Sequence, residues 1–154
     1  MSEIKQTKPF SCLEEEVFLN LQRTTDLLRN HFQGTIKAEG LTGAQYNILR
    51  ILRGAGEAGL VCREIGARMI TKDPDITRLL DRMEARGLVM RTRDTKDRRV
   101  IQTRITPAGL DLLASLDDKV TSRHQTLLGH LSVAELETLS ALLEKARTKS
   151  SETE

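Results

Sequence analysis

The sequence predicts a mainly α-helical protein that carries a single two-stranded β-ribbon. Apolar residues recur every three or four positions along most of the 154 residues, which is the spacing of helices that bury one face. Only residues 88–105 form short segments rich in β-branched side chains, and a charged turn divides them. Aromatic residues are 3% of the chain, so the core must be built from Leu, Ile, Val and Met.

Helix boundaries follow from residues that can satisfy the free backbone groups at helix ends. Three residue pairs at positions i and i+3 have the capping-box pattern: Ser11 with Glu14, Thr42 with Gln45, and Ser132 with Glu135. The predicted helices cover approximately residues 11–34, 42–53, 62–69, 74–86, 107–127 and 132–147. The glycine-rich stretch 54–59 separates the second helix from the third.

The fourth predicted helix, from Pro74 to Arg86, has the clearest buried stripe. Asp73 is a candidate N-cap, Pro74 suits the first helical position, and Gly87 suits the position after the helix. Its apolar residues have the i, i+3, i+4, i+7 spacing: Ile76, Leu79, Leu80 and Met83. The opposite side of this helix is therefore predicted to face away from the core.

Two helices joined by a turn, followed by a small hairpin, are the elements of a winged helix-turn-helix in their usual order. The predicted strands lie in segments 88–93 and 99–105, and the residues between them form a polar turn. We therefore expect residues 1–154 to form one unit with a winged-helix DNA-binding core at 42–106.

The flanking segments, 11–41 and 107–149, are predicted to be helical dimerisation regions, and residues 150–154 a disordered tail. Their Leu stripes exceed what a small winged helix needs for its own core, so we expect them to pack against a second copy of the chain. The alternative is a monomeric helical bundle.

Positive charge is concentrated in the middle of the chain. Residues 62–106 carry 12 basic and 7 acidic side chains, whereas the whole chain has a net charge of only +2. A local basic region of this kind is typical of a nucleic-acid-binding surface, although many solvated surfaces look similar. Double-stranded DNA is therefore the predicted partner.

The candidate base-reading residues lie on the outward side of the fourth helix. They are Asp75, Thr77, Arg78 and Arg82. Arg78 and Arg82 are four residues apart and share one face. Arginine reads guanine through O6 and N7 and also pairs with phosphate. The alternative is a solvated face on which Arg78 pairs with Asp75 or with Asp81.

Residues 42–109 resemble the MarR family of winged-helix regulators. The matching text is DITRLLDRMEARGLV, then R-x-R-D-x-x-D-R-R, then ITPAG, in that order. The resemblance implies a cytoplasmic homodimer that binds pseudo-palindromic operators and represses nearby genes. It also implies release by a small phenolic or other aromatic effector, or by oxidation of a cysteine.

The resemblance places Asp97 and Arg99 on the wing, where the arginine enters the minor groove and the aspartate helps to hold the wing's shape. A narrow A·T-rich minor groove attracts arginine through its enhanced negative potential. Arg98 is the adjacent positive charge, and which of the two arginines enters the groove is open. Arg91 and Arg93, on the first strand, are expected to reach backbone phosphates.

An effector pocket is expected between the dimerisation helices and the winged helix, with Phe18, Leu21, Phe32 and Tyr46 as candidate lining residues. Cys12, at the start of the first helix, is a candidate redox sensor because a helix N-terminus favours the thiolate. Three glutamates follow it and oppose that effect. Cys62 is predicted to be a small buried filler.

No catalytic grouping is apparent, and we expect no enzyme activity, no cofactor and no metal site. The sequence lacks HExxH, GxSxG and a phosphate-binding glycine loop. No apolar run is long enough for a membrane span and the N-terminus lacks a signal pattern, so we expect no membrane partner and a cytoplasmic location. The alternative function is a winged-helix protein-interaction module without a DNA role.

Overall fold

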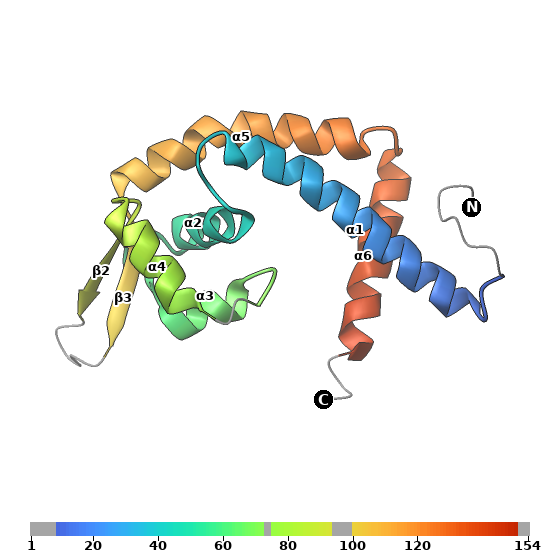
Figure 1. The fold of residues 1–154 in the computed structure, drawn as a ribbon, viewed down its shortest axis with the longest axis horizontal. Coiled ribbons are helices and arrows are strands. Elements are labelled where there is room, and N and C mark those ends of the chain that lie inside the picture. Colours follow the sequence, from blue (N-terminus) through green and yellow to red (C-terminus); the bar gives the residue numbers. More distant parts are fainter. Residues whose placement is uncertain (1–8, 73–74, 94–99, 151–154) are drawn as a thin grey trace.

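The structure is a computed structural model that describes residues 9–72, 75–93 and 100–150. Within these residues six α-helices, one 3-10 helix and three short strands follow one another (Figure 1). In chain order they are α1 (Leu13–Lys37), α2 (Gly43–Ala55), η1 (Gly56–Ala58), β1 (Leu60–Val61), α3 (Cys62–Arg68), α4 (Ile76–Ala85), β2 (Val89–Arg93), β3 (Ile101–Ile105), α5 (Pro107–Leu128) and α6 (Val133–Ser150). The mainly α-helical, winged-helix prediction is confirmed. The predicted tail, 150–154, lies outside the described residues except for Ser150, which ends α6.

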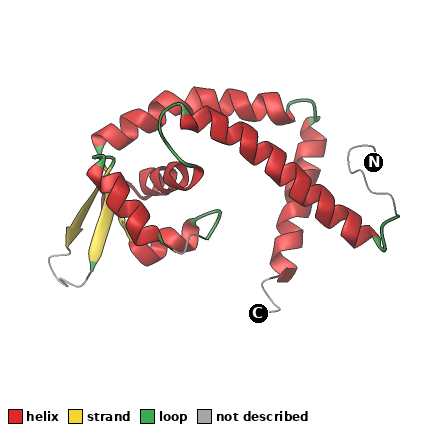
Figure 2. Ribbon diagram, viewed as in Figure 1, coloured by secondary structure: helices red, strands yellow, loops and turns green. Residues whose placement is uncertain are grey.

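The elements form a winged-helix region at one end of the molecule and a helical region at the other (Figure 2). The strands, α2, α3 and α4 make up the first region. Helix α5 runs from that region to the far end, where the N-terminal half of α1 and helix α6 lie. No helix in the described part of the chain combines the length and apolar character that a membrane crossing needs.

The sheet has three strands, in the order β1-β3-β2, and all pairs are antiparallel. The predicted hairpin supplies β2 and β3, but the prediction of only two strands was wrong. Leu60 and Val61, which form β1, pair with Thr103 and Gln102 along the edge of β3 that faces away from β2. Gly59, with φ of +65°, permits this pairing, because a Cβ there would lie only 2.6 Å from the Thr103 carbonyl oxygen.

One hydrophobic core lies in the winged-helix region and extends to the start of α5. Its fully buried large side chains include Ile36, Ile48, Leu49, Leu52, Ile65, Leu80, Met83, Val89, Leu113 and Leu116. Of the 25 residues of α1, only Ile36 is buried, and no described side chain of α6 belongs to the core. Large apolar side chains of both helices are exposed in one chain, among them Leu13, Val17 and Phe18 of α1 and Val133 and Leu142 of α6.

Two of the three predicted capping boxes are present. The Gln45 backbone N–H donates to Thr42 Oγ1 at 3.3 Å, and Gln45 Oε1 accepts from the Thr42 N–H at 3.0 Å. At the start of α6, Glu135 Oε2 accepts from the Ser132 N–H at 2.8 Å. The hydrogen bonds from Ser132 lower the pKa of the Glu135 carboxyl.

The start and end of the first helix differ from the prediction. Cys12 is the N-cap and makes no side-chain capping hydrogen bond, while Ser11 donates its backbone N–H to Glu15 instead of pairing with Glu14. The helix also continues through Gly34 to Lys37. A single glycine costs only about 1 kcal/mol in a helix interior, which a long helix tolerates.

Candidate nucleic-acid interface

Helix α4 presents an exposed polar face because the core holds its apolar stripe. Leu79, Leu80 and Met83 are buried, as their spacing predicts. Four polar side chains on the remaining surface of α4 are exposed: Thr77, Arg78, Asp81 and Arg82. The Arg78 side chain is 77% exposed, which leaves its guanidinium available to a ligand as large as a DNA duplex.

Asp75, at the start of α4, contacts both the backbone and the side chain of Arg78. The structure starts α4 at Ile76 with Asp75 as its N-cap, so the predicted start at Pro74 was wrong. Asp73 and Pro74 themselves lie outside the described residues. Asp75 Oδ1 accepts from the Arg78 backbone N–H at 3.3 Å, and Oδ2 lies 3.6 Å from Arg78 Nη1. Asp75, predicted to contact DNA, therefore caps the helix and orients an arginine.

Two further predicted contacts on α4 have partners within the chain. Arg82 Nε donates to the Arg78 carbonyl oxygen at 3.3 Å, which turns the Arg82 side chain back along the helix. Thr77 Oγ1 lies 3.8 Å from Cys62 Sγ, at the start of α3. Cys62 packs against the core, as predicted, but it is half-buried and not fully buried.

Arg91 on β2 is held by carboxylates of α4. Its Nη2 lies 2.6 Å from Asp81 Oδ1 and 2.6 Å from Glu84 Oε2. The hydrogen bond from Arg91 is the main reason that the pKa of Glu84 is lowered. The expectation that Arg91 reaches a phosphate is not met in the free protein, whereas Arg93, at the end of β2, is exposed.

The tip of the wing, with the predicted contacts Asp97, Arg98 and Arg99, lies outside the described residues. The strands on either side of it, β2 and β3, are paired from Val89↔Ile105 to Arg93↔Ile101.

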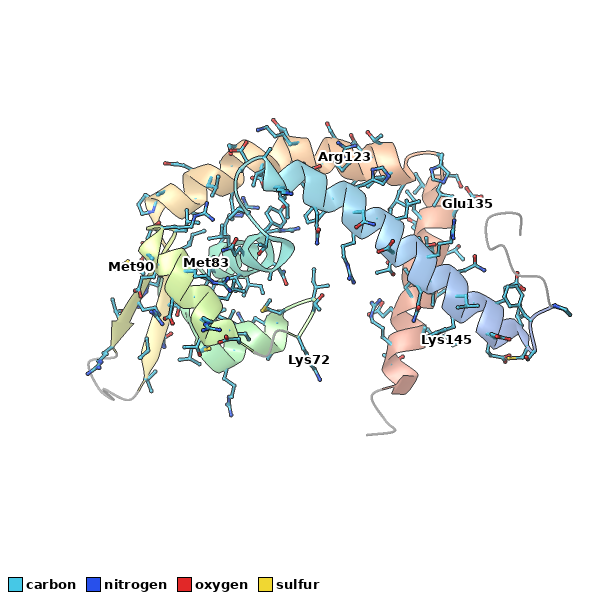
Figure 3. All side chains as sticks on the ribbon, viewed as in Figure 1. Lys72, Met83, Met90, Arg123, Glu135 and Lys145 are labelled. Carbon is cyan, nitrogen blue, oxygen red and sulfur yellow. The ribbon has the colours of Figure 1, made fainter. Side chains whose placement is uncertain are left out.

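Three further exposed cations, not selected from the sequence, precede α4 in the chain. Arg63 and Arg68 are on α3, and Lys72 is in the loop that follows it (Figure 3). The signal for them was the net positive charge of residues 62–106, which could not say which cations share a surface with α4. Cations at such positions suit backbone phosphates.

The four candidate effector-pocket residues are divided between two places in the described part of the chain. Phe32 and Tyr46 make an edge-to-face contact with ring centroids 5.4 Å apart, and His124 stacks on Phe32 at 5.8 Å. Phe18 and Leu21 lie farther toward the N-terminus of α1, where they help line an open groove of 340 Å³. Leu21 and Phe32 are separated by roughly 16 Å of helix, which accounts for the division.

Cys12 is exposed at the N-cap of α1, with the carboxylates of Glu14 to Glu16 in the next turn. Residues 9–72, 75–93 and 100–150 contain no cluster of three His, Cys, Asp or Glu side chains that could hold a metal ion. Nothing in this geometry tests oxidation of Cys12.

A bidentate ion pair joins the winged-helix region to α5. Arg53 Nη1 and Nη2 donate to the two carboxylate oxygens of Asp117 at 2.8 and 3.1 Å. The hydrogen bond from Arg53 is the main cause of the lowered pKa of Asp117. Lys119 adds a second link, to Glu39 at 2.7 Å, so α5 is tied to the segments before and within the winged helix.

Asp117→Asn is expected to reduce the free energy of unfolding at pH 7 by about 0.5–1 kcal/mol, since the pair is partly exposed to solvent. A carboxyl with a lowered folded-state pKa stabilises the fold above its unfolded pKa, about 3.9, and loses that effect as pH falls through the folded value. Urea unfolding at pH 7 and at about pH 3 checks this. An equal loss at both pH values would contradict it.

Comparison with known proteins supports one family. The sequence profile of the MarR family matches residues 41–101. A putative transcriptional regulatory protein for the hcr operon of Thauera aromatica is 30% identical over 139 residues, which cover 90% of this chain and 82% of that protein. The HTH-type transcriptional repressor MdtR of Bacillus subtilis is 34% identical over 97 residues, which cover 63% of this chain and 61% of MdtR.

Two solved structures extend the similarity beyond the profile match. A MarR transcription factor from Planctomyces limnophilus is 40% identical, with a TM-score of 0.69 over 88% of this chain and 98% of that chain. BpsR from Bordetella bronchiseptica, whose DNA binding is regulated by 6-hydroxynicotinic acid, is 26% identical, with a TM-score of 0.79 over 91% of this chain and 98% of that one. With a winged helix, an exposed arginine face on α4 and relatives that match along nearly its whole length, this chain belongs to the MarR family and is a transcriptional regulator, not an enzyme.

Proposed function

We propose that the protein is a repressor that binds a pseudo-palindromic operator as a homodimer. The proposal rests mainly on α4: its apolar stripe is buried in the core, and Arg78 and Arg82 are exposed on its surface. The major groove admits one α-helix, and arginine is the side chain that most often reads guanine there. The relative MdtR is named a transcriptional repressor, which supports repression over activation.

The proposed homodimer forms through α1 and α6. Exposed apolar side chains are concentrated on these helices: Leu13 at 71%, Val17 at 49%, Phe18 at 57%, Val133 at 72% and Leu142 at 59%. Soluble monomers rarely leave so many large apolar side chains exposed on two helices. Two winged helices related by a two-fold axis can then meet successive major grooves about 34–36 Å apart.

The wing is proposed to reach the minor groove beside the site of α4. In this arrangement Arg99 enters the groove and Asp97 holds it beforehand, because an unrestrained arginine would lose on the order of 2 kcal/mol of rotamer freedom on binding. On a regular strand the side chains of Arg98 and Arg99 would point to opposite faces, so only one of the two would enter the groove.

Arg99→Ala is expected to weaken operator binding at least about tenfold, because it removes the minor-groove contact. Dimerisation and the melting temperature should not change. Gel-shift titration measures the affinity, and Arg98→Ala is the matched control. A loss confined to Arg98→Ala would assign the groove contact to Arg98, and unaltered affinity in both would remove the wing from binding.

Operator affinity is also expected to fall steeply with salt. Each Lys or Arg that neutralises a phosphate releases counterions, so the logarithm of the association constant should decrease linearly with the logarithm of salt concentration. Titrations between about 50 and 200 mM salt check this. A flat plot would contradict DNA binding through the basic region of residues 62–106.

We further propose that an aromatic effector releases the operator by binding near Phe32, Tyr46 and His124. These rings join α1, α2 and α5, so a ligand there would contact both the winged helix and the dimerisation helices. BpsR, which responds to 6-hydroxynicotinic acid, makes an aromatic acid a reasonable first probe. Oxidation of Cys12 is the competing route, and operator release by peroxide that Cys12→Ser abolishes would identify it.

Capture of genomic DNA fragments on the purified protein, followed by sequencing, tests the proposed function as a whole. We expect enriched fragments that share an inverted repeat with half-sites about one helical turn apart. Retention of no specific fragment, combined with specific capture of a protein partner, would favour the alternative of an interaction module.

A further inference from the structure

Arg91 connects the root of the wing to the recognition helix through both its backbone and its side chain. Its N–H donates to Glu84 Oε1 at 3.0 Å, and its Nε and Nη2 donate to Glu84 Oε2 at 2.8 and 2.6 Å. Nη2 also lies 2.6 Å from Asp81 Oδ1. Both carboxylates belong to α4, one turn apart, so a single arginine joins the last turns of α4 to β2.

This contact is more protected than the other charged groups of the interface. The Arg91 side chain is 24% exposed, whereas that of Arg78 is 77% exposed. A guanidinium engaged by two carboxylates is directional, because its planar donors fit carboxylate oxygens in only a few orientations. The lowered pKa of Glu84 is consistent with a carboxylate that stays ionised in this contact.

The position of Arg91 in the sheet determines what the contact can control. Arg91 pairs with Thr103 on β3, and the last paired residue of β2 is Arg93. The wing therefore leaves the sheet only two residues beyond Arg91. A rotation of β2 relative to α4 at this point would also turn its partner β3, so it would change the angle between the paired wing strands and the recognition helix.

We propose that Arg91 is a positioning residue for DNA recognition: by joining β2 to Asp81 and Glu84, it sets the angle between wing and recognition helix so that both enter their grooves together. The inference rests on the proposed function, with α4 in the major groove and the wing in the minor groove. It replaces the expectation that Arg91 contacts a phosphate. Arg91 then affects DNA sequence preference without touching the DNA.

The expected signature is a loss of selectivity for the base pairs beside the α4 site. A narrow A·T-rich minor groove attracts the wing arginine, so the native protein should prefer an operator with A·T flanks to one with G·C flanks. In Arg91→Met, which keeps the aliphatic stem, that preference should fall by roughly threefold or more. The charge-swapped pair Arg91→Glu with Glu84→Arg should restore most of it.

Salt dependence separates positioning from a phosphate contact. Removal of a phosphate contact lowers the slope of log affinity against log salt by about 1. Arg93→Met, on the exposed end of the same strand, is the matched control and should show that decrease. Arg91→Met should keep the native slope while losing flank selectivity.

The experiment measures the affinity of the full-length protein and its variants for an operator recovered from genomic fragments, with native, A·T and G·C flanks, at several salt concentrations. Arg91→Met that keeps flank selectivity, or that lowers the salt slope by about 1, overturns the inference. Asp81→Ala combined with Glu84→Ala, which removes both partners of Arg91, gives a second measurement if Arg91→Met does not fold, and intact flank selectivity there overturns the inference equally. Failure of the native protein to select any fragment would instead refute the proposed function.

Discussion

Arg78→Ala is expected to weaken operator binding about ten- to a hundredfold and to relax specificity at one base pair of each half-site. A bidentate arginine–guanine contact contributes about 1–3 kcal/mol of discrimination. Arg78 has the required geometry: it is in the first turn of α4, its side chain is 77% exposed, and Asp75 lies 3.6 Å from its Nη1. The N-terminal half of a recognition helix is the part nearest the base edges.

Fluorescence anisotropy with the recovered operator and a set of single-base variants measures both affinity and specificity. Arg23→Ala is the matched control, because Arg23 is exposed on α1, outside the winged-helix region, and the substitution removes the same charge. The control should retain specificity. Uniform weakening across all operator variants by Arg78→Ala would show that Arg78 contacts phosphate instead of a base.

Leu142→Glu is expected to dissociate the dimer and to reduce operator affinity by about a hundredfold or more, because two linked half-sites bind with an avidity gain of roughly 10²–10⁴. Leu142 is 59% exposed in one chain, on a helix that contributes no described side chain to the core. A buried glutamate in the proposed interface would be costly to desolvate, whereas the fold of a single chain does not depend on Leu142.

Sedimentation at micromolar concentration measures the dimer, and circular dichroism checks the helices. Ala141→Glu is the control, since it introduces the same charge at an exposed position about 100° around α6 from Leu142. A monomeric native protein, or a Leu142→Glu variant that remains dimeric, would exclude the proposed pairing through α6.

Local patterns were sufficient for most of the fold. The stripe of α4 is buried as its spacing predicts, and Gly87 has the positive φ, +69°, of a residue after a helix end. The boxes at Thr42 and Ser132 formed because both partners lie within one turn of the same helix. A pattern was less reliable where two neighbouring side chains could accept the same hydrogen bond. The capping box was predicted between Ser11 and Glu14, but the Ser11 N–H donates to the adjacent Glu15.

The sequence also predicted much of the candidate site, but not the partners of its residues. It selected Arg78 and Arg82 correctly as exposed residues of α4. It could not show that Asp75 caps the helix or that the carboxylates of α4 occupy Arg91. Strand β1 was missed because two residues carry no periodicity, and only their contact with β3 makes them a strand.

By itself the sequence determined the helices, the hairpin, the basic middle third and the arginine face of α4. These features depend on spacings of three or four residues and on charge content, which a chain carries before it folds. Tertiary structure alone decided which charges are available to DNA. Arg91 and Arg93 are two residues apart on one strand, yet one meets carboxylates from α4 and the other is exposed. That difference arises because α4 packs against the root of the wing, and no local pattern encodes which long-range neighbour a side chain will meet.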